Sequence, residues 1–231
     1  MKTIYFVTEG KTDKIVIQGL LEKWLGEEDF VVRHVQPPTS AYVEDLDTNL
    51  SEGWKGVVDW CKGGRSTGPA GRDEAIRLAD CLIVHVDADV ALDPDFKNPP
   101  FVPVLPLDID SQCEWVCDTL QQFFDHSALE KILFCIPAQD LEAWIVAALH
   151  PDVAIEHDPI ESRKEPAALL VQRAPHRLVR RKDGKLKKQL GKYENSAQKI
   201  AQGWERNISG QLVACVSANR FERATRDFFK I

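Results

Sequence analysis

The stretch Ile4-Tyr5-Phe6-Val7-Thr8-Glu9-Gly10-Lys11-Thr12-Asp13 is the point from which the rest of the chain can be interpreted. Its β-branched and aromatic residues predict a buried strand over residues 2–8. The strand ends at a carboxylate, Glu9, and Gly10 lets the backbone turn sharply. A helix is predicted to follow, with Thr12 as its N-cap and Asp13 in its first turn.

A second apolar run ends in acids in the same way. Residues 81–86 are almost unbroken apolar, as expected for a central parallel strand that is covered on both faces. Asp87 and Asp89 follow directly, and an acid-x-acid pair can converge on one Mg²⁺ or Mn²⁺ ion. The alternative is an ordinary strand that ends in polar residues. His85, inside the run, is interpreted as a hydrogen-bonded core residue.

The order of elements predicts an α/β fold with an open, mostly parallel sheet and Rossmann-like layers. Strands are expected at 2–8, 30–36, 81–86 and 132–136, with helices between them. Residues 1–150 are expected to form this domain, and residues 151–231 a helical, partly basic extension. Residues 151–192 carry no strand signal in this interpretation, and 37–48, 63–71 and 91–106 are expected to be loops.

Composition indicates a cytoplasmic protein. Hydrophobic residues make up 44% of the 231 residues, and no apolar run approaches the ~20 residues of a membrane span. The N-terminus enters a strand without a signal-peptide pattern. Six cysteines are scattered without a CxxC motif, which favours reduced thiols over a zinc site.

The predicted topology gathers the acids. Because ligands of open parallel sheets bind beyond the carboxyl ends of the strands, Glu9, Asp13, Asp87 and Asp89 are expected at one edge of the sheet. Several carboxylates that close repel one another unless a divalent cation lies among them. The simpler alternative makes Asp13 a helix-capping acid and Glu9 a solvated loop residue.

The combination of strand–Glu-Gly-Lys-x-Asp–helix with a later strand–Asp-x-Asp resembles the Toprim domain, the metal-binding module of topoisomerases, bacterial primases, recombination proteins and nucleases of the overcoming-lysogenization-defect family. The resemblance covers roughly residues 1–136 and rests on Glu9, Gly10, Asp13, Asp87 and Asp89. It implies a divalent metal at Asp87 and Asp89 and a catalytic role for Glu9. In the nuclease branch, the acid at the position of Asp13 helps to hold a second metal.

Two further features bear on the resemblance. The segment from Pro137 to Trp144, with Glu142 in Glu-Ala-Trp, is similar to small Toprim-like proteins linked to mobile-element or phage defence. Glu142 is expected to complete the acidic cluster or orient a water, unless it is an exposed helix acid. The long proline-rich stretch after Asp89 and the low number of tyrosines (three) depart from topoisomerases and primases, which favours a small stand-alone phosphodiesterase.

A basic stretch supplies the opposite charge. The net charge is −7, but residues 173–192 hold nine Lys or Arg and one acid, which is +8 and leaves −15 for the remainder. Such a cluster suits a phosphate backbone, although a solvated surface loop has the same composition. The residues expected to bind nucleic acid, DNA more than RNA, are Arg177, Arg180, Arg181, Lys182, Lys185, Lys187 and Lys188.

The leading hypothesis is a Mg²⁺- or Mn²⁺-dependent, Toprim-like nuclease, with a role in phage or mobile-element defence and a partner protein encoded nearby as further expectations. Two ions are expected, one held by Glu9, Asp87 and Asp89 and one by Asp13 with Glu142. Lys11 or the basic stretch is expected to neutralise charge on the phosphate. The rivals are a nucleotide-sugar glycosyltransferase that uses Asp87 and Asp89, and a non-catalytic module that binds nucleic acid or a partner.

Overall fold

A computed structural model describes the chain of 231 residues except for 27–29, 38–52, 64–70, 97–107 and 158. The loops expected at 37–48 and 63–71, and most of that at 91–106, lie outside the described residues. No helix in the described part is long and apolar enough to cross a membrane.

Four parallel strands form the central sheet in the order β2-β1-β3-β4, which confirms the predicted α/β class and the parallel sheet. The register pairs Ile4 of β1 with Cys81 of β3, and Leu82 of β3 with Ile132 of β4. The strands are β1 (Lys2–Val7), β2 (Phe30–Gln36), β3 (Cys81–His85) and β4 (Ile132–Cys135).

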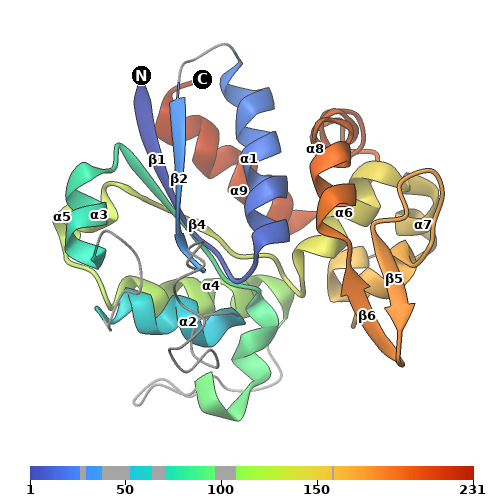
Figure 1. Cartoon of the computed structure of the whole chain (residues 1–231), viewed down its shortest axis with the longest axis horizontal. Helices are drawn as coiled ribbons and strands as arrows, with labels where there is room; N and C mark the ends of the chain where they lie inside the picture. Colours follow the sequence, from blue (N-terminus) through green and yellow to red (C-terminus); the bar gives the residue numbers. More distant parts are fainter. Residues whose placement is uncertain (27–29, 38–52, 64–70, 97–107, 158) are drawn as a thin grey trace.

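Helices cover both faces of the sheet (Figure 1). Because side chains alternate along a strand, Ile4 and Ile83 face one core and Tyr5 and Leu82 face the other. The first face carries α1 (Lys11–Leu25), α6 (Leu141–Leu149), α8 (Leu190–Trp204) and α9 (Val216–Phe229). The second carries α2 (Gly53–Cys61), α3 (Arg72–Leu78), α4 (Ile109–Gln121) and α5 (His126–Leu129).

An aromatic cluster joins the C-terminal helices to the first face. Trp144 of α6 lies with its ring centroid 5.3 Å from that of Trp204 of α8, and Trp24 of α1 lies 5.6 Å from Trp204. Phe221 of α9 stacks on Trp144 at 6.0 Å. The core therefore continues across residue 150, and helices far along the chain are fixed against α1.

The basic stretch forms a β-hairpin, which corrects the expectation that residues 151–192 contain no strand. β5 (Val179–Lys182) pairs antiparallel with β6 (Lys185–Lys188), and we call these ten residues the basic hairpin. Asp183 and Gly184 both have positive φ, as a two-residue hairpin turn requires. Short elements precede it: α7 (Pro151–Glu156), η5 (Ile160–Ser162) and η6 (Pro166–Leu170).

Several element ends differ from the sequence prediction. Helix α1 begins at Lys11 after Gly10, so Thr12 is inside the helix and does not cap it. Strand β3 ends at His85 and β4 at Cys135, one residue earlier than predicted in each case. The stretch after β3 folds into short 3₁₀ turns, η3 (Ala88–Leu92) and η4 (Pro94–Phe96), and a π-helical turn, η7 (Glu205–Ser209), follows α8.

Candidate functional site

Glu9 and Asp87 meet at the carboxyl ends of the neighbouring strands β1 and β3. The backbone amide of Asp87 donates a hydrogen bond of 2.8 Å to Glu9 Oε1. Two further hydrogen bonds fix the backbone after Asp87. The Ala88 amide donates to the Pro137 carbonyl at 2.7 Å, and Gln112 Nε2 donates to the Ala88 carbonyl at 2.7 Å. Loops after β1, β3 and β4 therefore hold one another in place.

Asp13 is buried in the first turn of α1, facing the same edge of the sheet. Thr12 Oγ1 donates to Asp13 Oδ1 at 3.3 Å. Gly10 has an extended φ of −144°, so it does not supply an unusual conformation here. A Cβ at Gly10 would lie 3.1 Å from Asp13 Oδ2, and the glycine therefore makes room for the carboxylate.

The start of α6, after β4, adds two more acids. Glu142 is completely buried, and its Oε1 accepts a hydrogen bond of 2.7 Å from the Tyr193 hydroxyl. Asp140, the N-cap residue, has a buried Oδ1 without a hydrogen-bond partner among the described residues. Sequence analysis did not select Asp140, although it follows a strand as Glu9 does. We call Glu9, Asp13, Asp87, Asp140 and Glu142 the acid cluster.

Lys188, the last residue of the basic hairpin, reaches into the acid cluster. Its Nζ lies 2.8 Å from Glu142 Oε2 and 3.5 Å from Asp13 Oδ1. The contact with Glu142 is within ion-pair distance, but its angles do not meet those of a hydrogen bond. The side chain is 36% exposed, so the stem of Lys188 reaches solvent while the ammonium lies among carboxylates. Sequence analysis placed Lys188 on the nucleic-acid face and missed this contact.

The charges of the cluster perturb one another. Burial, and then the charge of Asp87, raises the pKa of Glu9 to about 8. Burial, and then Asp13, raises the pKa of Asp87 well above its ordinary value, and burial with Glu142 does the same for Asp140. These shifts are what excess negative charge in a buried place produces.

Lys188 reverses the shift on the acid beside it. Burial acts to raise the pKa of Asp13, but the charges of Lys188 and His85 outweigh it and the pKa is lowered. Burial acts to lower the pKa of Lys188, but Asp13, Glu142 and Tyr193 raise it well above its ordinary value. Lys188 is therefore a permanent cation inside the cluster.

His85 lies beneath Asp87 and is completely buried. Its Nε2 is 3.3 Å from Asp87 Oδ1, at an angle that makes no hydrogen bond with any described residue. His85 is therefore a core residue, as predicted, but the predicted hydrogen bond is not present among the described residues. The contact places a buried imidazole next to the acid cluster.

Two predicted site residues lie apart from these contacts. Asp89 is exposed on η3, and its pKa is raised by burial of the carboxyl and then by Asp93. Lys11 is exposed at the first position of α1. The acid-x-acid spacing thus places Asp87 in the cluster and Asp89 one turn further out.

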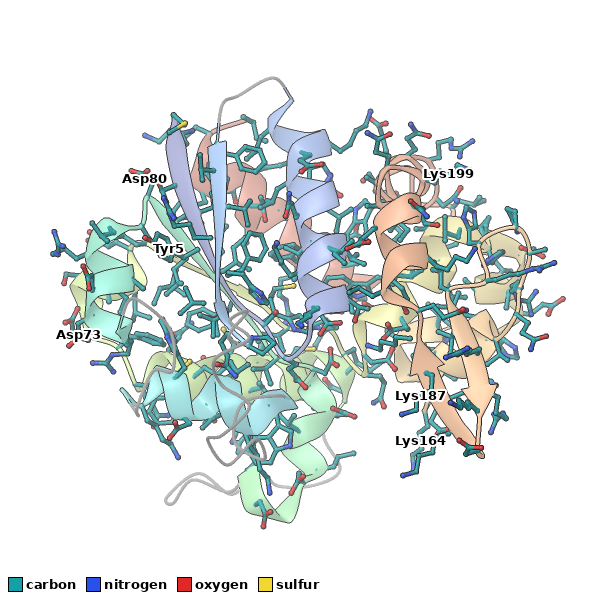
Figure 2. The ribbon with its side chains drawn as sticks, in the orientation of Figure 1. Tyr5, Asp73, Asp80, Lys164, Lys187 and Lys199 are labelled. Carbon is teal, nitrogen blue, oxygen red and sulfur yellow. The ribbon has the colours of Figure 1, made fainter. Side chains whose placement is uncertain are left out.

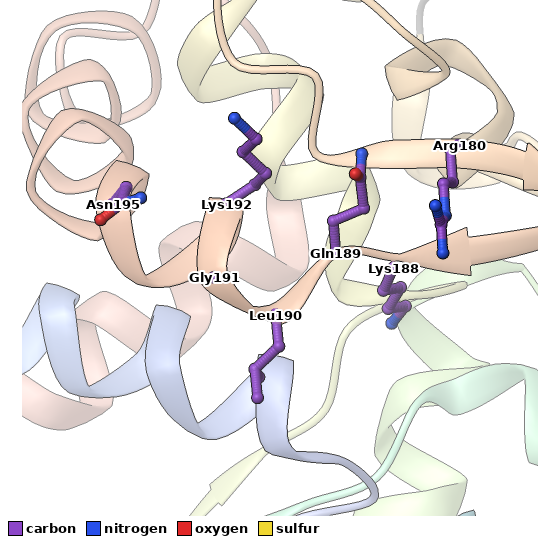
Figure 3. Close-up of a pocket in the computed structure, with 7 residues that line it drawn as sticks. All are labelled: Arg180, Lys188, Gln189, Leu190, Gly191, Lys192 and Asn195. Atoms are coloured by element: carbon purple, nitrogen blue, oxygen red, sulfur yellow. The ribbon is translucent and has the colours of Figure 1, made fainter.

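The outer face of the basic hairpin is open to solvent. Arg177, Arg180, Arg181, Lys182, Lys185 and Lys187 are all exposed. Figure 2 shows Lys187 on the side that carries the hairpin, at the opposite end of the molecule from Asp73 and Asp80. An open hollow of about 550 Å³ lies between the hairpin and the start of α8, lined by Arg180, Lys188, Gln189, Leu190, Gly191, Lys192 and Asn195 (Figure 3).

The acid cluster fits a hard divalent cation in its chemistry. Its donors are carboxylate oxygens, the ligands that Mg²⁺ and Mn²⁺ prefer. Asp87 Oδ1 and Asp140 Oδ1 are buried without hydrogen-bond partners among the described residues, and the pKa values of Glu9 and Asp87 are raised as for a site short of positive charge. No three His, Cys, Asp or Glu side chains in the described part are already arranged as a ligand set.

Comparisons with protein-family models, with curated proteins and with solved structures gave no match.

Proposed function

We propose that this protein is a Toprim-like, Mg²⁺- or Mn²⁺-dependent phosphodiesterase that cleaves nucleic acid, DNA in preference to RNA. The observation that carries the proposal is the acid cluster at the carboxyl ends of β1, β3 and β4, entered by a lysine from a basic hairpin. A phosphodiesterase needs both parts, because its polyanionic substrate must be brought over acidic metal ligands.

In this proposal Glu9 and Asp87 hold the ion, with Asp89 on the next turn available to it. When bound, the ion supplies Lewis acidity that lowers the pKa of a water molecule. Glu9 is already bound to the Asp87 amide through Oε1, so Oε2 is the oxygen left for a ligand or a proton. In the metal-free protein the Glu9 carboxyl, with a pKa of about 8, holds a proton at neutral pH, and binding of a cation would release that proton.

The basic residues act on the substrate. The exposed cations of the hairpin would bind the backbone through counterion release, without reading sequence. Lys188 is placed between the two regions, since it lines the hollow and contacts the cluster. A phosphate that enters from the hollow therefore meets an ammonium before it meets carboxylates, which offsets their repulsion.

The test is cleavage of fluorescent single- and double-stranded DNA and RNA by the purified protein. We expect cleavage with Mg²⁺ or Mn²⁺, none with EDTA, and a loss of at least about 100-fold in Glu9→Gln. Asp118→Asn on the exposed face of α4 is the matched control and should cut normally. Activity in EDTA, or full activity of Glu9→Gln, would refute the proposal.

The same samples separate the rivals. Binding of DNA with a steep salt dependence but no cleavage under any metal would favour a non-catalytic module. Thermal stabilisation by UDP together with Mn²⁺, and by neither alone, would favour a glycosyltransferase.

A further inference from the structure

The acid cluster has two halves that differ in what neutralises them. Glu9 accepts a hydrogen bond from the Asp87 backbone amide, and both carboxyl groups have a raised pKa. Asp13 and Glu142 meet the Lys188 ammonium, at 3.5 and 2.8 Å. One half is therefore short of positive charge and the other already holds a cation.

The position of Lys188 is set by the fold. Lys188 pairs with Val179 across the basic hairpin, and the next residue, Gln189, donates its amide to the Leu178 carbonyl at 2.9 Å. Val179 and Leu178 are buried, which fixes this end of the hairpin against the core. In Figure 3 the side chain of Lys188 points away from that of Lys192.

Tyr193 completes the arrangement around Glu142. Its hydroxyl donates to Oε1 while the Lys188 ammonium faces Oε2, so both oxygens of this buried carboxylate have a partner. Tyr193 is itself fully buried in the first turns of α8, directly after the hairpin. A carboxylate with both oxygens occupied in this way has little capacity left for a metal ion.

We propose that Lys188 is the resident cation of the Asp13–Glu142 half, so that the acid cluster takes one divalent ion, at Glu9 and Asp87, and not the two that the sequence suggested. An ammonium 2.8 Å from an oxygen stands where an ion with oxygen ligands at 2.0–2.6 Å would have to sit. The inference rests on the proposed function only in requiring that the cluster binds a divalent ion.

The experiment counts ions by isothermal titration of the metal-free protein with Mn²⁺, and needs no cleavage. Wild type should bind one ion in the cluster, and Lys188→Met should bind two, because the freed Asp13 and Glu142 then take the second. Lys188→Arg keeps the charge and should return the count to one. Lys199→Met, on the exposed face of α8, is the matched control and should bind one ion as the wild type does.

Two ions in wild type, one ion in Lys188→Met, or no binding at all would overturn the inference. If Lys188→Met does not fold, Lys188→Gln takes its place, since it removes the charge and keeps a polar end group that can donate hydrogen bonds. The two claims fail separately: one bound ion without cleavage would contradict the proposed nuclease and leave the inference intact, whereas cleavage with two bound ions would do the reverse.

Discussion

The half-buried carboxyl of Glu9 adds to the pH dependence of the metal-free protein's stability near neutrality, and Glu9→Gln should remove that contribution. Glutamine keeps a side-chain oxygen to accept the Asp87 amide and cannot ionise. The folded protein holds a proton on Glu9 up to a pKa of about 8, whereas an ordinary glutamate releases it near 4.5. Stability is therefore complete below about 4.5 and falls as pH rises through 8.

The size of the effect follows from that interval. At about 1.4 kcal/mol per pKa unit, ionising Glu9 in the folded state costs at most about 5 kcal/mol. Between pH 6 and pH 8 the loss is about 2 kcal/mol, or a fall of about 4–8 °C in Tm for a chain of this length. Asp87 and Asp140 also have raised pKa values and add their own slopes, so the quantity to compare is wild type minus variant.

The assay is thermal unfolding by circular dichroism from pH 5.5 to 8.5 in EDTA. Wild type should lose more stability with rising pH than Glu9→Gln, and Glu156→Gln on the exposed end of α7 should follow wild type. Mn²⁺ should flatten the wild-type curve, because a bound cation favours the ionised carboxylate. Parallel curves for wild type and Glu9→Gln would refute the reasoning.

Three other predictions follow from the same geometry. Asp87→Asn should lower Mg²⁺-dependent DNA cleavage at least about 100-fold in a fluorescence assay, and an unchanged rate would show that Asp87 has no role in cleavage. Lys187→Ala should reduce the slope of log DNA affinity against log salt by about one, measured by anisotropy. Identical slopes for wild type and variant would show that Lys187 does not contact the DNA backbone. Gly203→Ala would put a Cβ 2.2 Å from the Ala148 carbonyl oxygen, so denaturant unfolding should show a loss of about 3 kcal/mol, whereas Gly191→Ala should change stability by less than about 1 kcal/mol. Equal stability of these two variants would contradict the packing of α8 on α6.

The parallel sheet was predictable because its strands carry strong local signals. Residues 81–86 are apolar enough to specify a doubly covered strand, and acids directly after strands must gather at one edge when the strands are parallel. The contact of Glu9 with the Asp87 amide, 78 residues apart in sequence, follows from that rule. Asp140 obeys the same rule and could have been found by it.

The basic hairpin was not predicted because its residues have low β-propensity. Lysine and arginine occupy nearly every position of β5 and β6, so no apolar alternation indicates strands. The signal that was present is Asp183-Gly184, a two-residue turn between runs of equal length. The partners of Lys188 could not be read from sequence at all, since Asp13 lies 175 residues away and only tertiary packing brings them together.

The central claim is that Glu9 and Asp87 bind a divalent ion at the edge of the sheet, and anomalous scattering from crystals grown with Mn²⁺ tests it most directly. The account predicts one anomalous peak within bonding distance of carboxylate oxygens of Glu9 and Asp87, with Lys188 still on Glu142. A saturated crystal with its Mn²⁺ elsewhere, or with none bound to these two carboxylates, would contradict it.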